Sequence, residues 1–227
     1  MTAAPRFGEY STLLETARAR AGFEAQTTTQ LHQDLFDYVG ANRDRGAGIV
    51  EVGCFRGGSS VLLAYLCRCY GWPFYTLDTD PEALRITGAL LRDLGLAEVT
   101  RLHLGSLDSL AAGVELERTP VLVFVDAHHA YPSVVRDIRA VYRLNRRPHA
   151  VAFHDFSLRS RDDAEIQVDR AILDCFGTSV PLVRIGMQFE DGPGGATRGE
   201  SAYWWEAPGT EGVIVELPSV ETSTAIH

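Results

Sequence analysis

Short apolar runs alternate along the central part of the chain with longer segments in which apolar residues recur every three or four positions. The runs predict strands that are covered on both faces, and the longer segments predict amphipathic helices. Strands that alternate with helices in this way are typical of a doubly wound parallel sheet. The predicted parallel strands are residues 49–52, 72–78, 99–104, 121–125 and 150–153.

The two ends of the chain add elements to this sheet. Apolar residues at helical spacing predict two helices before the first strand, over residues 10–17 and 31–39, with one of the threonines 27–29 as the cap of the second. After the fifth strand, the pattern predicts a polar loop, a helix that Gly177 ends, and two strands joined by a glycine-rich segment. The predicted loop covers residues 157–163 and the predicted helix covers 166–176. The two predicted strands cover 180–189 and 201–206, and the segment that joins them covers 191–199.

The predicted fold class is therefore α/β, with a Rossmann-like, doubly wound seven-stranded sheet of five parallel strands plus a C-terminal antiparallel hairpin. An N-terminal helical extension precedes this sheet. The expected organisation is an extension over residues 1–45, a ligand-binding domain over 46–217 and a tail over 218–227.

Composition narrows the class of partner. The chain has 227 residues, of which 45% are hydrophobic, and this is enough for one domain with a sizeable core. Its net charge of -9 argues against a nucleic-acid partner, because binding to phosphates needs a basic face. No apolar run reaches the length of a membrane span, and the four cysteines lack the spacing of a metal site. These features predict a cytoplasmic protein that binds small molecules and neither nucleic acid nor membrane.

The segment IVEVGCFRGGSS, residues 49–60, combines a buried strand, a glycine-rich turn and the start of a helix. Gly53, Gly57 and Gly58 allow a ligand to approach main-chain amides directly, and Ser59 or Ser60 is expected to cap the helix. The spacing differs from the G-x-G-x-x-G pattern, which disfavours NAD. The segment predicts a site for a nucleotide-like ligand, and the alternative is a tight turn with a purely structural role.

Acidic residues end three of the predicted strands. Asp78 ends the second strand, where a carboxylate accepts hydrogen bonds from ribose hydroxyls in doubly wound folds, whereas Asp80 is expected to cap a helix. Asp126 and the pair His154 and Asp155 follow the fourth and fifth strands. If these strands are neighbours, the two carboxylates converge and repel each other unless a cation such as Mg²⁺ lies between them, with His154 as a third ligand.

Other interpretations of these residues stay open. Each aspartate alone fits a helix cap or an ion pair. His128, His129 and His154 with the carboxylates also fit the zinc site of a hydrolase, although that function would leave the glycine-rich turn unexplained.

The segments IVEVGCFRGGSS, YTLDTDPEAL, VLVFVDAHHAYPSVVRDI and AVAFHDF together resemble the metal-dependent small-molecule O-methyltransferases of the class I S-adenosylmethionine (SAM) fold. The resemblance is to the branch related to macrocin and mycinamicin sugar methyltransferases and to the cephalosporin-biosynthesis protein of that fold. It extends over about half of the chain, and its most specific part is the Asp-x-x-His-x-Tyr segment followed by Phe-His-Asp.

The resemblance implies roles for individual residues. Asp126 and Asp155 would bind Mg²⁺ and His129 would act as the base, while His154 departs from the acid or amide that is usual at its position. It also favours a homo-oligomer. The implied SAM contacts are Glu51, Gly53, Cys54, Phe55, Gly57, Ser59, Asp78, Ser106, Leu107 and Asp126.

The sequence thus predicts a SAM-dependent O-methyltransferase, assisted by a divalent metal, that acts on a hydroxyl of a small metabolite of the natural-product or sugar type. Two alternatives are a non-catalytic partner protein with the SAM fold and a metal-dependent hydrolase without SAM. Binding of SAM separates the hydrolase from the other two.

Overall fold

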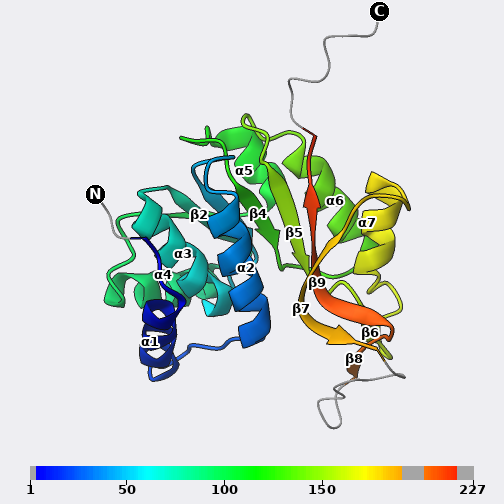
Figure 1. Ribbon diagram of the computed structural model, residues 1–227, viewed down its shortest axis with the longest axis horizontal. Helices are drawn as coiled ribbons and strands as arrows, with labels where there is room; N and C mark the ends of the chain where they lie inside the picture. The colour runs from blue at the N-terminus through cyan, green and yellow to red at the C-terminus, as the bar shows by residue number, and fades with distance from the viewer. Residues whose placement is uncertain (1–3, 191–201, 219–227) are drawn as a thin grey trace, which may run out of the picture.

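One seven-stranded sheet organises the computed structural model, which describes residues 4–190 and 202–218 (Figure 1). Counted across the sheet, the first five strands run parallel to one another. The next strand is antiparallel to its neighbour in this group, and the edge strand is antiparallel to that strand. The predicted fold class is confirmed. In spatial order the strands are β3 (Thr100–Leu104), β2 (Phe74–Asp78), β1 (Ile49–Val52), β4 (Leu122–Val125), β5 (Ala150–His154), β9 (Gly209–Glu216) and β7 (Val183–Phe189).

Helices cover both faces of the sheet (Figure 1). Apolar residues of β1 alternate between the two faces: Ile49 belongs to one buried cluster, and Val50 and Val52 belong to the other. The helices of the first face are α1 (Phe7–Arg18), α2 (Thr29–Ala41), α3 (Gly58–Tyr70) and α4 (Pro81–Asp93), and those of the second are α5 (Leu107–Gly113), α6 (Tyr131–Val141) and α7 (Val168–Phe176).

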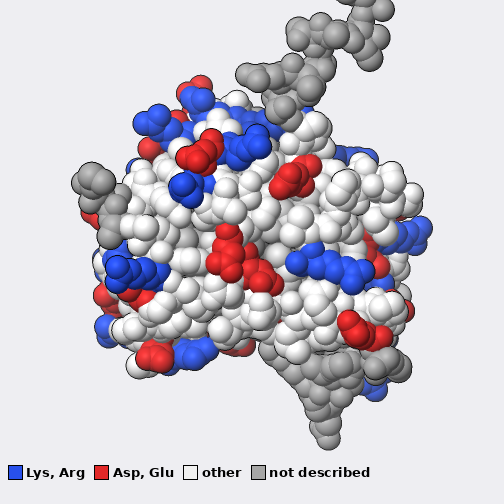
Figure 2. All heavy atoms as spheres, in the orientation of Figure 1, with Lys and Arg blue, Asp and Glu red and all other residues white. Residues whose placement is uncertain are grey.

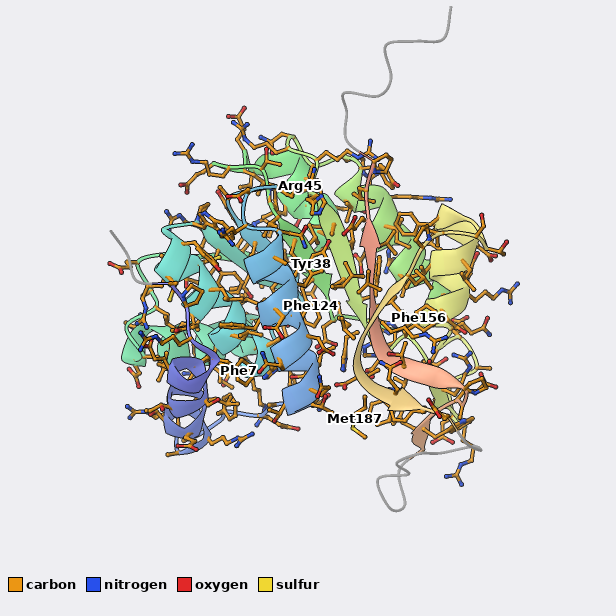
Figure 3. All side chains as sticks on the ribbon, in the orientation of Figure 1. Phe7, Tyr38, Arg45, Phe124, Phe156 and Met187 are labelled. Carbon is orange, nitrogen blue, oxygen red and sulfur yellow. The ribbon has the colours of Figure 1, made fainter. Side chains whose placement is uncertain are left out.

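The two N-terminal helices share the core of the sheet. Tyr10 of α1 and Leu31 of α2 are fully buried in the same cluster as Phe124 of β4, and Tyr38 of α2 packs against that cluster (Figure 3). Their amphipathic patterns are satisfied within the chain, because α1 packs on α3 while α2 contacts both α3 and β7.

A buried histidine connects these helices. His32 of α2 lies between Tyr10 and Thr27, with 2.5 Å from its Nδ1 to the Tyr10 hydroxyl and 2.7 Å from its Nε2 to Thr27 Oγ1. Burial lowers the pKa of His32 to about 4, because the charged ring is poorly solvated there. A lone histidine in an amphipathic helix predicts an ordinary surface or packing role, and the structure gives His32 the packing role.

We expect His32 to make folding stability depend on pH. The folded pKa of about 4 lies below the unfolded value of 6.5, so the unfolded chain binds more protons between these values. Stability from the neutral ring is therefore present above pH 6.5 and is lost as the pH falls toward 4. In urea unfolding, the decrease in unfolding free energy between pH 7 and pH 4.5 should be smaller by roughly 2 kcal/mol in His32→Gln than in the wild type. Equal decreases would contradict this assignment.

The segment predicted as the second strand of the hairpin, residues 201–206, is wrong. The strand that pairs with both β5 and β7 is β9, whereas Tyr203–Trp205 (β8) pairs with Leu158–Ser160 (β6) in a separate two-stranded sheet. The polar loop predicted over 157–163 therefore contains a strand. β9 was missed because its first half contains Gly209, Glu211 and Gly212, residue types that are depleted in strands. The predicted joining segment 191–199 and residues 219–227 of the predicted tail lie outside the described residues.

Two of the predicted helix caps are present and one is not. Thr28 caps α2 by accepting from Leu31 N, and Asp80 caps α4 by accepting from Glu82 N. The helix α3 instead begins after Gly57, and neither Ser59 nor Ser60 caps it. In residues 4–190 and 202–218, no helix combines the length and the apolar character needed to cross a membrane.

Candidate active site

A cavity of about 480 Å³ lies at the carboxyl ends of the parallel strands. This is the edge at which doubly wound sheets bind ligands, beside the break in strand order between β1 and β4. Glu51 and Gly57 do not line the cavity, although the sequence predicted them as cofactor contacts. The predicted contacts that do line it are Gly53, Cys54, Phe55, Ser59, Asp78, Ser106, Leu107 and Asp126.

The glycine-rich turn is tightly packed under this cavity. Gly53 has a φ of +89°, and a Cβ there would lie 2.1 Å from the main-chain oxygen of Asp126. A Cβ at Gly58 would lie 2.8 Å from Cα of Ala25 in the connection between α1 and α2. These glycines allow the ends of β1 and β4 and the N-terminal connection to meet, which brings Gln26 and Thr27 into the cavity wall.

Glu51 is a structural carboxylate rather than a lining residue. Its side chain is fully buried and accepts hydrogen bonds of 2.6 Å each from Ser59, Ser60 and Thr76. Burial raises the pKa of Glu51 to about 7, although the three hydroxyl donors oppose the rise. The residue joins β1 to β2 and to the first turn of α3, which explains why the two serines do not cap that helix.

Asp78 fixes the shape of the turn from the neighbouring strand. Its Oδ2 accepts from Phe55 N at 3.0 Å, and its Oδ1 accepts from Asp80 N at 2.9 Å. The carboxylate also lines the cavity, so its predicted contact with ribose hydroxyls stays a prediction.

Four titratable side chains converge beside the cavity. Asp126 and His129 follow β4, and His154 and Asp155 lie at the end of β5, with one potential ligand atom of each lying within 4.8 Å of the others. His154 Nδ1 lies 2.9 Å from Asp126 Oδ1 and 3.3 Å from Asp155 Oδ2. The strand order confirms the reason for this convergence, because β4 pairs directly with β5.

The donor set fits a divalent cation. His129 Nε2 is buried without a hydrogen-bond partner among the described residues, although it lies 3.3 Å from Asp155 Oδ2 and 3.6 Å from Asp126 Oδ1. The two carboxylates, Asp126 and Asp155, are ligands that Mg²⁺ accepts, and the unsatisfied imidazole nitrogen of His129 beside them is available to take a proton. Asp155 has a φ of +54°, an uncommon conformation for a residue with a side chain, and such conformations concentrate at functional sites.

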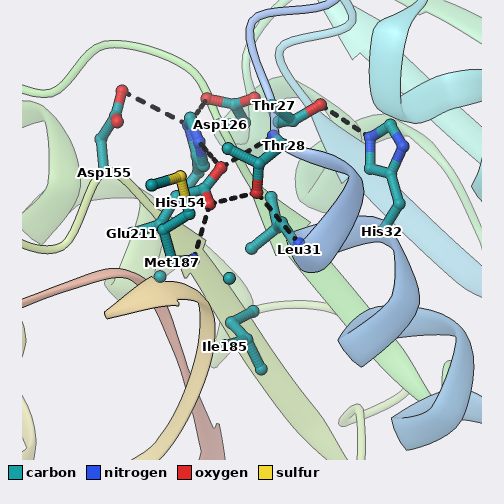
Figure 4. A network of polar contacts seen from close by, with 12 residues as sticks. Thr27, Thr28, Leu31, His32, Asp126, His154, Asp155, Ile185, Met187 and Glu211 are labelled. Atoms are coloured by element: carbon teal, nitrogen blue, oxygen red, sulfur yellow. Dashed lines mark hydrogen bonds and ion pairs between the residues drawn. The ribbon is translucent and has the colours of Figure 1, made fainter. Parts of the chain in front are cut away.

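Glu211 of β9 also contacts the cluster, and this residue was missed in the sequence analysis. The side chain is fully buried and lies 3.4 Å from His154 Nε2 through Oε1 (Figure 4). Its carboxylate also accepts from Thr28 N, Thr28 Oγ1 and Met187 N, at 2.9, 2.5 and 3.0 Å. His154 is thus held between Asp126 and Glu211, and the start of α2 is connected to the site.

The charges of the cluster support one another. Burial alone would lower the pKa of His154, but Asp126 and Asp155 outweigh burial and raise it well above the usual value. Burial alone would raise the pKa of Asp126, but the neighbouring His154 and His129 outweigh burial and lower this pKa. The cluster is therefore built around the ionised carboxylate of Asp126.

Residues 50–156 match the family model described as a methyltransferase domain. The chain contains a methyltransferase domain. The matched segment runs from β1 to the residue after Asp155, so it holds the glycine-rich turn and all four residues of the cluster. No match was found among curated proteins.

Solved structures share the fold of this methyltransferase domain and of the elements around it. An O-methyltransferase from Bacillus cereus in complex with SAH superposes with a TM-score of 0.62 at 15% identity, over 94% of this chain and 92% of that one. TomG from Streptomyces achromogenes is an O-methyltransferase involved in tomaymycin synthesis that was solved with SAM. It superposes with a TM-score of 0.60 at 18% identity, over 95% of this chain and 92% of that one. An rRNA methylase from Streptococcus thermophilus superposes with a TM-score of 0.51 at 18% identity, over 86% of this chain and 100% of that one.

The family model confirms the predicted methyltransferase class for residues 50–156, and the solved structures share the class I fold. At such low identities the likeness to solved structures concerns the fold, and the acceptor of the methyl group is a separate question.

Proposed function

We propose that the methyltransferase domain transfers the methyl group of SAM to a hydroxyl of a small metabolite, with a divalent cation held by Asp126 and Asp155. The observation that carries this proposal is the convergence of Asp126, His129 and Asp155, of which Asp126 and His129 line the same cavity as the predicted SAM contacts. Asp126 lines that cavity and belongs to the cluster, so the donor and the reacting oxygen would meet there.

The residues have separate tasks in this reaction. A bound cation would supply Lewis-acid polarisation of the acceptor hydroxyl. His129 Nε2, which has no hydrogen-bond partner in the described residues, takes the hydroxyl proton. The oxygen then forms a bond to the methyl carbon as the bond from carbon to the sulfonium sulfur breaks, and SAH leaves uncharged at sulfur. His154 holds Asp126 in place; to act as the predicted third ligand through Nδ1, it would give up that 2.9 Å contact.

The surface favours a small acceptor over RNA, although an rRNA methylase shares the fold. The chain carries a net charge of -9, and on the face in Figure 2 the basic side chains of the described residues are interspersed with acidic ones. Phosphate binding needs a basic surface. A cytoplasmic location and self-association stay predictions from the sequence.

Methyl transfer is expected to depend on the cation. Protein incubated with methyl-tritiated SAM and metabolite extracts should label a product, and EDTA should reduce the rate at least about 100-fold because the acceptor hydroxyl loses its polarising cation. Added Mg²⁺ should restore the rate. SAH binding, measured by calorimetry with and without EDTA, should change little. Full activity in EDTA would contradict the role of the metal, and absence of SAH binding would contradict the whole proposal in favour of the hydrolase alternative.

His129→Ala is expected to lower the rate near neutral pH by about 10²-fold or more, because the general base is lost. The rate of the variant should rise with pH, since an acceptor that is already ionised needs no base. The measurement is the pH profile of transfer in wild type and variant, with His149→Ala as the control, because His149 comes before β5, at the opposite end of that strand from the site. A profile of the same shape in His129→Ala and wild type would remove the assignment.

A further inference from the structure

A second cavity of about 490 Å³ adjoins the first on the other side of the cluster. Its wall includes His129, His154 and Asp155, and it shares Gln26 and Ala127 with the first cavity. His129 lines both cavities, so a molecule in the second cavity reaches a histidine that a molecule in the first also reaches. The volume is that of a typical small-molecule site.

The outer wall of this cavity comes from the two-stranded sheet that the sequence did not predict. Leu158 of β6, Trp204 and Trp205 of β8 and Ile166 form an apolar, aromatic lining. Trp205 is anchored, because its Nε1 donates to Asp155 Oδ1 at 3.1 Å and its ring stacks on Phe189 at 5.3 Å. Trp204, the next residue back along the strand, is partly buried and lines the cavity. An anchored aromatic wall of this kind suits a flat apolar ring.

The charged lining residues differ from those of a phosphate or carboxylate site. Among the described residues, the lining contains Asp155 and Asp163 together with three histidines, and no arginine. Arg159, on the neighbouring strand, is paired with Asp169 and Glu206, each at 2.7 Å. Anionic groups would therefore find no unpaired guanidinium in the described part of this lining to bind them.

We propose that this second cavity is the acceptor site and that it takes a hydroxylated molecule with a flat apolar ring and no anionic group. The inference rests on the proposed function, and it deepens that function by defining the class of acceptor. The ring lies against Trp204, a hydroxyl points to Asp155 and His129, and neutral or cationic substituents face Asp163. Phosphorylated and carboxylated acceptors, RNA included, are disfavoured.

Three probes that share a 3,4-dihydroxyphenyl ring and differ in the charge of their third substituent test this inference. They are 3,4-dihydroxybenzyl alcohol, 3,4-dihydroxybenzylamine and 3,4-dihydroxybenzoate, titrated by calorimetry into full-length protein saturated with SAH and Mg²⁺. The alcohol and the amine should each bind at least about ten-fold more tightly than the benzoate, because the described lining offers no guanidinium to bind a carboxylate. Tightest binding of the benzoate, or no binding of any probe, would overturn the inference.

A pair of variants tests the place of the ring. Trp204→Ala should weaken binding of the alcohol about ten-fold, and Trp204→Phe should stay within about three-fold, because phenylalanine keeps an aromatic face. SAH affinity should be unchanged in both, which separates loss of the acceptor wall from unfolding. Equal affinities for the alcohol in wild type and Trp204→Ala would contradict the acceptor site. If SAH itself fails to bind the wild type, the proposed function fails first; if SAH binds and the probes show no selectivity, only this inference fails.

Discussion

Asp126→Asn is expected to lower methyl transfer by at least about 10³-fold while SAH affinity stays within about three-fold of the wild type. The amide has the shape of the carboxylate, so the wall of the first cavity keeps its form. What is lost is one of the two negative charges at the cation site and the charged partner of His154, whose Nδ1 lies 2.9 Å away.

The same variant should bind the cation more weakly, and this can be measured without turnover. Titration with Mn²⁺, followed by the electron paramagnetic resonance of free Mn²⁺, should show an affinity lowered by at least about ten-fold, since a neutral amide oxygen replaces a carboxylate ligand. Asp37→Asn is the matched control, because Asp37 is exposed on α2 and bonds only to Gln33. Wild-type Mn²⁺ affinity with lost transfer would assign Asp126 to the chemistry alone, and wild-type transfer would refute its role.

The strand ends explain why much of this site could be predicted from the sequence. Parallel strands end at one edge of a sheet, so Asp126 and Asp155, each directly after or at the end of an apolar run, converge once β4 and β5 are neighbours. The resemblance supplied the strand order, and the structure confirms it. The resemblance also assigned Glu51 to the cofactor, although Glu51 faces the opposite way from Val50 and Val52, into the buried face beside α3.

The parts that the sequence analysis missed depend on contacts between distant segments. Glu211 lies near the start of a strand that opens on Gly209 and also contains Gly212. The two glycines and the glutamate are depleted in strands, so propensity hides both the strand and the buried acid. Nothing local pairs residues 158–160 with 203–205, and their pairing builds the wall of the second cavity. Likewise, the connection between α1 and α2 enters the first cavity because Gly58 has no side chain to keep Ala25 away.

Glu211→Ala is expected to lower the free energy of unfolding by about 3 to 5 kcal/mol, which is the usual cost of removing one partner from a buried charged network. The variant leaves Thr28 N, Thr28 Oγ1, Met187 N and His154 Nε2 without their acceptor, at a position where the glutamate is fully buried. For a domain of this size the melting temperature should fall by about 10 °C. Urea unfolding at pH 7 provides the measurement.

Glu211→Gln should be less destabilising than Glu211→Ala, because the amide oxygen of glutamine still accepts a hydrogen bond. It should remain less stable than the wild type, because the amide nitrogen would face hydrogen-bond donors instead of accepting from them. Glu216→Ala is the matched control on the same strand: Glu216 is exposed and bonds to the Tyr38 hydroxyl, so its loss should cost less than about 1 kcal/mol. A double-mutant cycle with Thr28→Val should show coupling of at least about 0.5 kcal/mol, since Thr28 and Glu211 share a hydrogen bond. Additive effects, or equal stability of Glu211→Ala and the wild type, would mean that the N-terminal helices do not support the site through Glu211.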